Sequence, residues 1–346
     1  MIGIDGSMGE GGGQVLRTAL SLSMITGEAV NVANIRAGRR KPGLMRQHLT
    51  AVKAAEEISG ARVDGDFPGS LELEFKPGRI RHGSYHFAVG TAGSATLVLQ
   101  TILPALLSAE GESDLIMEGG THNPLAPPFD YLDKTFLPLL RRMGADVSVV
   151  LFRHGFFPAG GGKFAVKAAG GRLSAPSFPD RGAVTAVRAE CLYANLPTSI
   201  VKRECSVLEN RLGLERGGAR FRRVDSAGPG NAAMVEVDVE DGRGGVLTEV
   251  FTGFGERQIT SEMVAERVAA EAEEYVNADA ALGKHTADQI LLPMALAGDG
   301  EFSTLEPSLH ATTNMEVIEK FLPVSFSVRN GTGRGTFLVT CKNKEK

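Results

Sequence analysis

The chain has 346 residues, a formal net charge of -4, 42% hydrophobic residues and 23% charged residues. These values are ordinary for globular proteins, but the length exceeds what one hydrophobic core usually supports, so we predict two domains or one large domain with an insertion. The negative charge excludes a surface that is basic throughout, so a nucleic-acid partner would have to bind a local basic cluster.

The cysteines and the apolar segments indicate a protein of the reducing cytosol. Cys191, Cys205 and Cys341 are odd in number and lack CxxC spacing, which argues against a disulfide framework and against a zinc site. No apolar run reaches transmembrane length, and the start MIGIDG resembles a strand more than a signal peptide. We therefore expect a soluble, cytoplasmic protein with no membrane partner.

The first unit of the chain begins with a strand at 1–5 and a glycine-rich turn that opens an apolar helix ending near Gly27. Gly11, Gly12 and Gly13 precede this helix and can turn backbone N–H groups toward an anion, aided by the positive end of the helix dipole. The turn has neither Walker A nor Rossmann spacing. An anion site and an ordinary helix start both remain open here.

A basic loop follows the next strand, which we expect at 29–35, and leads into a helix at about 44–58. Five basic residues lie within eleven positions: Arg36, Arg39, Arg40, Lys41 and Arg46. Guanidinium groups on a glycine-bent loop suit bidentate contacts with phosphate, whereas a solvated charge run usually includes acidic residues. The loop therefore predicts phosphate binding, with a solvated loop as the alternative. Strands at 71–75 and 85–89 would close this unit.

The same plan of elements returns in a second copy. An apolar helix at 90–107 and a strand at 114–118 precede the polar loop GGTHNPLAPPFDYL and a helix at 130–143. The separation from the start of the helix to the polar loop is about twenty to twenty-five residues in each copy, a period long enough to be one supersecondary unit.

A third copy lies near the end of the chain and contains His310. A helix at 283–298 and a strand at 301–305 precede the loop PSLHATTN and a helix from Met315 to Leu322, and strands at 325–329 and 335–340 follow. A histidine between a strand and a helix could act as base, metal ligand or nucleophile, although a lone histidine in a polar loop more often only forms hydrogen bonds. Copies stacked around an axis would bring the basic loop, the GGTHNP loop and the histidine loop into one cleft.

The segment between the second and third copies has a different character. It predicts a self-contained α/β insert with strands at 183–192, 233–239 and 246–251 and helices at 199–212 and 261–276. Its glycine-rich spans at 216–218 and 241–245 predict hairpin loops, and it shows no catalytic constellation. We therefore expect a large domain at 1–179 and 280–346, and an insert domain at 180–279.

Seven stretches in colinear order carry a resemblance to a known family. They are GSMGEGGGQVLRT, RAGRRKPGLMRQHLTAVKAA, GTAGSATLVLQTILPALL, GGTHNPLAPPFDYL, RHGFFPAGGG, HTADQILLPMALAG and PSLHATTN. Across essentially its whole length the chain closely resembles the RNA 3′-terminal phosphate cyclases. The resemblance implies an α+β fold in which three βαβαββ-type repeats form a large domain, akin to the enolpyruvate transferases, with a smaller α/β insert domain.

The resemblance also implies a function: the ATP-dependent conversion of an RNA 3′-phosphate into a 2′,3′-cyclic phosphodiester by a monomer or homodimer. His310 would be the nucleophile that takes AMP from ATP. Matching positions assign nucleotide contacts to Arg17, Gln100, Pro127, His285, Thr286, Ala287, Asp288 and Gln289. They assign contacts with the RNA phosphate to Arg36, Arg39, Gln47 and His48, and a divalent metal, expected to be Mg²⁺, to Glu10. His285 departs from the family, because bacterial relatives often carry Tyr there.

Two other classes of protein share this architecture. A non-catalytic relative that acts as a scaffold in ribosome assembly would keep the fold but lack the nucleophile, so His310 and the glycine-rich loop argue against it. An enolpyruvate transferase would share the repeats, yet its chemistry needs no histidine–AMP intermediate.

Overall fold

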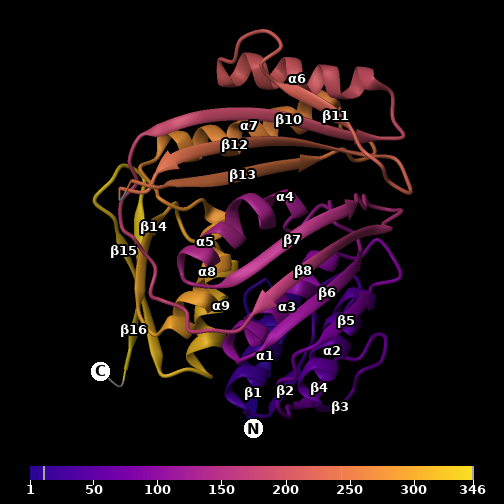
Figure 1. The fold of residues 1–346 in the computed structure, drawn as a ribbon, viewed down its shortest axis with the longest axis vertical. Helices are drawn as coiled ribbons and strands as arrows, with labels where there is room; N and C mark the ends of the chain where they lie inside the picture. The colour runs from indigo at the N-terminus through magenta and orange to yellow at the C-terminus, as the bar shows by residue number, and fades with distance from the viewer. Residues whose placement is uncertain (11, 243, 345–346) are drawn as a thin grey trace.

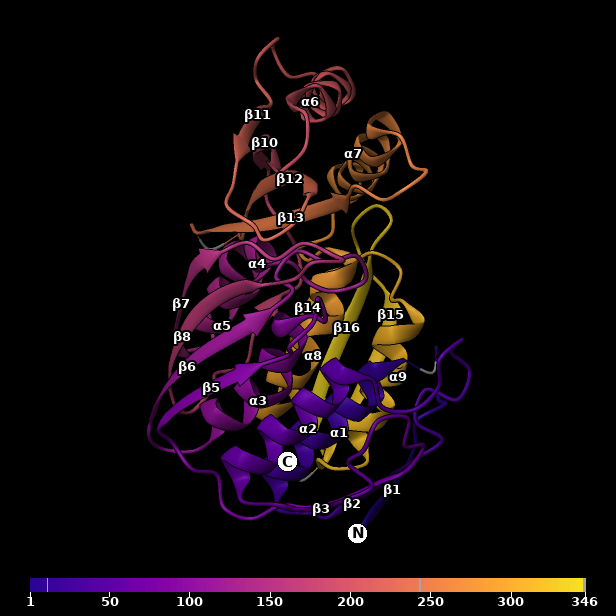
Figure 2. The ribbon, with the colours of Figure 1, turned by 90° about the vertical axis from the view of Figure 1, so that its right-hand side faces the viewer.

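Four four-stranded sheets and the helices between them make up residues 1–10, 12–242 and 244–344, which the computed structural model describes. Three of the sheets lie around a group of helices, and the fourth lies at one end of the molecule (Figures 1 and 2). This mixed arrangement confirms the expected α+β class.

The first sheet lies near the N-terminus and has the order β1-β2-β4-β3. Its elements are β1 (Ile2–Asp5), α1 (Gly13–Thr26), β2 (Val30–Ala33), α2 (Arg46–Ser59), β3 (Arg62–Asp64) and β4 (Leu73–Lys76). Both helices end at a glycine in the left-handed conformation, Gly27 with φ 77° and Gly60 with φ 60°. The elements expected up to position 75 are confirmed, and β3 was missed because its three residues are mostly exposed and carry no pattern.

The second sheet has the order β5-β6-β8-β7. Its elements are β5 (Ser84–Ala88), α3 (Ala95–Ser108), β6 (Glu112–Gly119), α4 (Phe129–Tyr131), η1 (Leu132–Phe136), α5 (Leu137–Arg142), β7 (Asp146–Arg153) and β8 (Gly162–Ala169). The strand expected to close the first unit is wrong in its partner, because β5 pairs in parallel with β6 and opens this sheet. The helix expected at 130–143 is divided: Pro138 offers no N–H to the preceding turn, and a π-helical turn, η1, lies just before it.

The third sheet has the order β15-β16-β14-β9. Its elements are β9 (Ser177–Phe178), α8 (Lys284–Ala297), β14 (Gly300–Thr304), α9 (Leu309–Glu319), β15 (Val324–Asn330) and β16 (Phe337–Asn343). The expected start of the last helix at Met315 is wrong. The Ser308 hydroxyl accepts the Ala311 N–H at 3.2 Å and caps a helix that begins at Leu309. His310 therefore lies in the first turn of a helix and not in a loop.

The fourth sheet has the order β11-β10-β12-β13 and lies with two helices above the rest of the molecule in Figure 1. Its elements are β10 (Val184–Ala194), α6 (Thr198–Leu212), β11 (Arg220–Arg223), β12 (Gly230–Glu240), β13 (Val246–Phe254) and α7 (Ser261–Asn277). The span 241–245, of which residue 243 lies outside the described residues, joins two antiparallel strands as expected. The span 216–218 leads from α6 to β11, which is parallel to β10, so the hairpin expected there is wrong.

The first three sheets share one topology when their strands are counted within each sheet. In each, the first strand is parallel to the second, the second is antiparallel to the fourth, and the fourth is antiparallel to the third. Helices α1, α3, α8 and α9 pack against one another between these sheets (Figure 2). Their apolar faces supply much of the core, including Leu16, Leu20, Ile102, Leu106, Ile290, Leu291 and Val317.

Two further properties bear on the sequence analysis. The three cysteines, Cys191, Cys205 and Cys341, are buried and form no disulfide. In the part of the chain that the structure describes, no helix has the length and hydropathy needed to cross a membrane.

Candidate active site

A pocket of about 370 Å³ opens where two helices begin. It is lined by Glu10, Lys284, His285, Asp288, Glu306, Pro307, Ser308, Leu309 and His310. Lys284 and His285 form the first turn of α8, while Leu309 and His310 form the first turn of α9. Two helix N-termini and Lys284 offer contacts for the negatively charged part of a ligand, while the carboxylates of Glu10, Asp288 and Glu306 also line the pocket.

The imidazole of His310 lies at this pocket beside Glu10. Its Nε2 is 2.9 Å from Glu10 Oε2, and the same oxygen is 3.7 Å from Arg39 Nη2. The His310 side chain is 40% exposed, so a ligand in the pocket can reach the ring. If Nε2 donates its proton to Glu10, the lone pair of the neutral ring lies on Nδ1. Attack through Nε2 would instead require this contact to break.

The glycine turn before α1 lets several side chains approach one another. A methyl group on Gly12 would lie 3.2 Å from Arg39 Nη2 and 3.8 Å from His310 Cε1. The absence of a side chain at Gly12 therefore leaves room for Arg39 and His310 to approach the same point of the turn. Gly11, also expected to take part in the anion-binding turn, lies outside the described residues.

On the neighbouring residue, Gly13, a methyl group would overlap His48 Nε2 and lie 2.8 Å from Arg17 Nη1. Desolvation lowers the pKa of Arg17 to about 10, against the opposing effect of the Asp288 carboxylate, so Arg17 remains a cation at neutral pH. Arg17 and His48, predicted to contact nucleotide and RNA phosphate, thus meet at the glycine turn.

The imidazole of His48 is buried at the start of α2 and is neutral. Its Nδ1 accepts the Met45 N–H at 3.2 Å, so its proton lies on Nε2. Burial, reinforced by the positive charge of Arg17, lowers the pKa of His48 to about 3. The neighbouring Gln47 uses its Oε1 to accept the Ser94 N–H at 3.1 Å and ties α2 to the start of α3.

In the basic loop, Arg36 and Arg39 have different environments. Arg36 has a φ of 55°, and its Nη1 donates to the carbonyls of Lys41 and Gly43, each at 2.8 Å. Burial and the charge of Arg39 lower the pKa of Arg36. Arg36 therefore closes its own loop, whereas Arg39 extends toward Glu10.

The buried carboxylate of Asp288, at the wall of the pocket, joins three helices. Its Oδ1 accepts from Gln14 Nε2 at 2.6 Å and from Asn314 Nδ2 at 3.3 Å, and its Oδ2 accepts from Gln289 Nε2 at 3.1 Å. Gln100 Nε2 donates to Gln289 Oε1 at 2.5 Å. Burial raises the pKa of Asp288, against the opposing hydrogen bonds. The predicted residues Gln100, Asp288 and Gln289 are thus brought together, while Gln14 and Asn314 were not singled out as partners of Asp288.

Three other predicted nucleotide contacts do not line the pocket. Thr286 and Ala287 are buried, and the Thr286 hydroxyl donates to Glu249 Oε2 at 2.7 Å. The Pro127 carbonyl accepts from the Thr96 hydroxyl at 2.7 Å, which ties it to α3.

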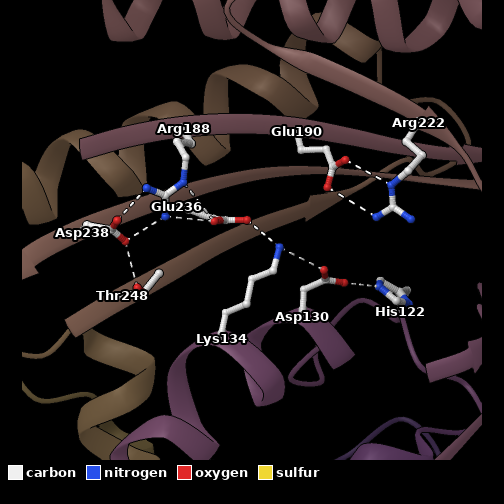
Figure 3. Close-up of polar contacts among 9 residues, drawn as sticks. All are labelled: His122, Asp130, Lys134, Arg188, Glu190, Arg222, Glu236, Asp238 and Thr248. Carbon is white, nitrogen blue, oxygen red and sulfur yellow. Dashed lines mark hydrogen bonds and ion pairs between the residues drawn. The ribbon is translucent and has the colours of Figure 1, made fainter. Parts of the chain in front are cut away.

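The GGTHNP loop, expected to join the other two loops, instead leads toward the fourth sheet. His122 is fully buried, with its Nε2 2.8 Å from Asp130 Oδ2 and its ring 4.9 Å from that of His154. Asp130 lies 3.4 Å from Lys134, which contacts Glu236 on β12 at 2.6 Å (Figure 3). This loop therefore supports the contact between the segment that follows β6 and the fourth sheet.

The carboxylate expected to bind a divalent metal, that of Glu10, lies at the pocket. Across residues 1–10, 12–242 and 244–344, no group of three or more His, Cys, Asp or Glu side chains is arranged to hold a metal ion. Three carboxylates line the pocket, those of Glu10, Asp288 and Glu306, and Glu10 is the one beside His310. One carboxylate together with substrate phosphates and water is a common way to hold Mg²⁺.

The family model and the two relatives reported below all carry the same name. The family model described as RNA 3′-terminal phosphate cyclase matches residues 8–328. A protein named RNA 3′-terminal phosphate cyclase from Koribacter versatilis (strain Ellin345) is 52% identical over 330 residues, which cover 95% of this chain and 92% of the relative. A protein of the same name from Ralstonia nicotianae (strain ATCC BAA-1114 / GMI1000) is 50% identical over 330 residues, covering 95% and 93%.

Proposed function

The chain belongs to the RNA 3′-terminal phosphate cyclase family of ligase-type enzymes, and from this premise we propose that it uses ATP to convert an RNA 3′-phosphate into a 2′,3′-cyclic phosphodiester. The observation that carries the proposal is the placement of His310 at a pocket formed by two helix N-termini, with Glu10 and Arg39 beside it. A nucleophile, positive helix ends and a guanidinium group are what in-line phosphoryl transfer needs.

The reaction proceeds in three displacements. First, the lone pair of neutral His310 attacks the α-phosphorus of ATP, an N–P bond forms, and pyrophosphate leaves. Next, an oxygen of the RNA 3′-phosphate attacks the same phosphorus, the N–P bond breaks, and an RNA–adenylate anhydride forms. Finally, the terminal 2′-hydroxyl oxygen attacks the 3′-phosphorus and loses its proton, and AMP leaves. Positioning and charge neutralisation supply most of the catalysis in such transfers.

The side chains around the glycine turn divide these tasks. Arg39 extends from the basic loop to Glu10, whose carboxylate also contacts His310, so we assign Arg39 to the RNA 3′-phosphate. Arg17 and the neutral Nε2–H of His48 lie one residue further along the turn and donate to phosphate oxygens. Glu10 would hold the Mg²⁺ that arrives with ATP, and this ion supplies neutralisation of the phosphate charge.

The start of α8 supplies the nucleotide contacts. Lys284 and His285 line the pocket, and the imidazole of His285 offers a π face to the adenine. Asp288 also lines the pocket, and Gln289 joins it to Gln100 by hydrogen bonds, so these three residues help to fix the orientation of α8. We assign Pro127, Thr286 and Ala287 to the walls of the nucleotide site, although none of the three lines the present pocket.

The architecture follows from the same premise. We propose that the three sheets of common topology are three βαβαββ repeats of one large domain, 1–179 and 280–346, and that 180–279 is an insert domain within the third repeat. The shared strand orders support the repeats, and the separate sheet β11-β10-β12-β13 supports the insert.

Product analysis tests the function against the two alternatives. The purified protein is incubated with ATP, Mg²⁺ and an RNA that ends in a labelled 3′-phosphate. We expect the label to become resistant to phosphatase as AMP and pyrophosphate accumulate. A scaffold would leave the end sensitive to phosphatase, and an enolpyruvate transferase would instead release phosphate from phosphoenolpyruvate in the presence of an alcohol acceptor. Either result would refute the proposal.

A further inference from the structure

A buried carboxylate from the fourth sheet lies at the start of α8. Glu249 belongs to β13, an end strand of that sheet, and its side chain is 3% exposed. Its Oε1 accepts the Gly283 N–H at 2.8 Å, and its Oε2 accepts the Thr286 hydroxyl at 2.7 Å. Both oxygens of the Glu249 side chain thus accept hydrogen bonds from the start of α8, a helix that is followed in the chain by β14 of the third sheet.

This contact anchors the start of a helix whose N-cap residue carries no side chain. The N-cap residue of α8 is Gly283, which has no side chain to accept a hydrogen bond from the first turn. A methyl group on Gly283 would lie 2.9 Å from Glu249 Oε2, so a larger N-cap residue would crowd the carboxylate. A carboxylate at this position also lies at the positive end of the helix dipole. Glu249 therefore anchors the start of α8 from a distant part of the chain, through the N–H of the N-cap residue and the hydroxyl of Thr286.

The capped turn is also the turn that lines the pocket. Lys284 and His285 lie between the two residues that Glu249 contacts, and Asp288 follows one turn later. A shift of the first turn of α8 would move these side chains relative to His310. We propose that Glu249 is a positioning residue, through which the fourth sheet holds the nucleotide-binding end of α8 in place. The inference rests on the proposed function, since it assigns ATP to this pocket.

Two substitutions of Glu249 and one matched control test the inference. Glu249→Ala removes both hydrogen bonds. Glu249→Gln can keep both, because its carbonyl oxygen accepts from Gly283 and its amide donates to the Thr286 hydroxyl, which can rotate to accept. Glu236→Ala is the control, since Glu236 also joins the fourth sheet to η1, at 2.6 Å from Lys134 and 3.2 Å from Arg188, without contacting α8 (Figure 3).

Three quantities are measured for each variant: the Kd of an ATP analogue with a methylene group between the α- and β-phosphorus, the rate of labelling by α-labelled ATP, and the rate at which adenylated protein passes AMP to RNA. We expect Glu249→Ala to weaken analogue binding and slow labelling by about tenfold, because small displacements at a site reduce its activity strongly. Transfer from protein already adenylated should change less than twofold. Glu249→Gln should remain within about threefold of the parent, and Glu236→Ala should bind the analogue as the parent does.

Equal weakening of analogue binding in Glu249→Ala and Glu236→Ala would overturn the inference, because the effect would then come from general docking of the fourth sheet. Parent-like binding by folded Glu249→Ala would overturn it as well. If Glu249→Ala does not fold, Glu249→Asp takes its place, because a side chain one methylene shorter cannot keep both hydrogen bonds, and parent-like analogue binding by folded Glu249→Asp would count against the inference. Failure of the parent protein itself to bind the analogue or accept AMP would instead refute the proposed function.

Discussion

Replacing Gly13 by Ala adds one methyl group at the first residue of α1. That group would overlap His48 Nε2 and lie 2.8 Å from Arg17 Nη1, which is closer than real side-chain contacts allow, so one or both side chains must move. His48 is 4% exposed and its Nδ1 is held by the Met45 N–H, so its ring cannot rotate freely away from the new methyl group. The substitution therefore displaces two groups that we assign to phosphate binding.

Stability and activity should respond differently to this change. Alanine favours a helix over glycine by about 0.5–1 kcal/mol, which offsets part of the strain, so we expect the melting temperature to change by less than about 3 °C. A displacement of about 1 Å at a reacting site costs on the order of a hundredfold in rate. We expect the transfer of AMP from adenylated protein to RNA to slow by about 10- to 100-fold.

The assay is a single-turnover transfer from purified adenylated protein to an RNA 3′-phosphate, with melting measured in parallel. Gly3→Ala is the matched control, because a methyl group on Gly3 in β1 would meet no atom within 4 Å. A folded Gly13→Ala protein that transfers AMP at the parent rate would refute the reasoning. Equal slowing in Gly3→Ala would also refute it.

Three further predictions follow from the site. Arg39→Ala should depress transfer to RNA more than self-adenylation and leave the melting temperature unchanged, and Arg39→Lys should restore transfer poorly. Arg36→Ala should also lower the melting temperature, because the Arg36 guanidinium closes the loop at 36–43. Equal loss of both half-reactions in Arg39→Ala would contradict the first of these expectations. An RNA whose terminal sugar lacks the 2′-hydroxyl should accumulate as the AMP-capped end, and an end that binds but never receives AMP would contradict the three-step order. Burial raises the pKa of Glu249 to about 7 from 4.5. Between these pH values Glu249 is protonated in the folded protein and ionised in the unfolded protein, so proton binding stabilises the fold at low pH. This stabilisation is lost as the pH rises through the folded pKa. The unfolding free energy of Glu249→Gln relative to the parent should therefore increase by up to roughly 3 kcal/mol between pH 5 and 8 in denaturant titrations, and a difference that is independent of pH would contradict the assignment.

Local signals located most of the elements. Apolar helices that end at a glycine were predicted well, because α1 combines a buried face with the left-handed Gly27 that ends it. The first turn of α9 was missed, since residues 309–313 are largely polar and the only sign of the helix start is the capping hydroxyl of Ser308. The pairing of β5 with β6 was also missed, because the residue pattern of β5 does not show which strand lies beside it. In the structure Tyr85 of β5 lies opposite Leu115 of β6.

The site was predictable only where a motif marks a residue. The motifs selected Glu10, Arg39 and His310, which the structure places together. The partnership of Gln14 with Asp288 carries no signal of its own, because the two residues are 274 positions apart and are brought together by α1 and α8 both packing against α9. The role of Glu249 is equally invisible in the sequence, since a glutamate in a strand does not show that it binds the N-cap residue of a helix 34 positions away.

Mapping the adenylated residue tests the central claim most directly. The protein is incubated with α-labelled ATP and Mg²⁺, digested, and the labelled peptide is sequenced, with His310→Ala as the comparison. We predict that all of the label lies on His310, that it is labile in acid and stable in alkali as a phosphoramidate is, and that the folded His310→Ala protein takes up none. Label on another residue, label with the stability of an ester, or undiminished labelling of His310→Ala would contradict the account.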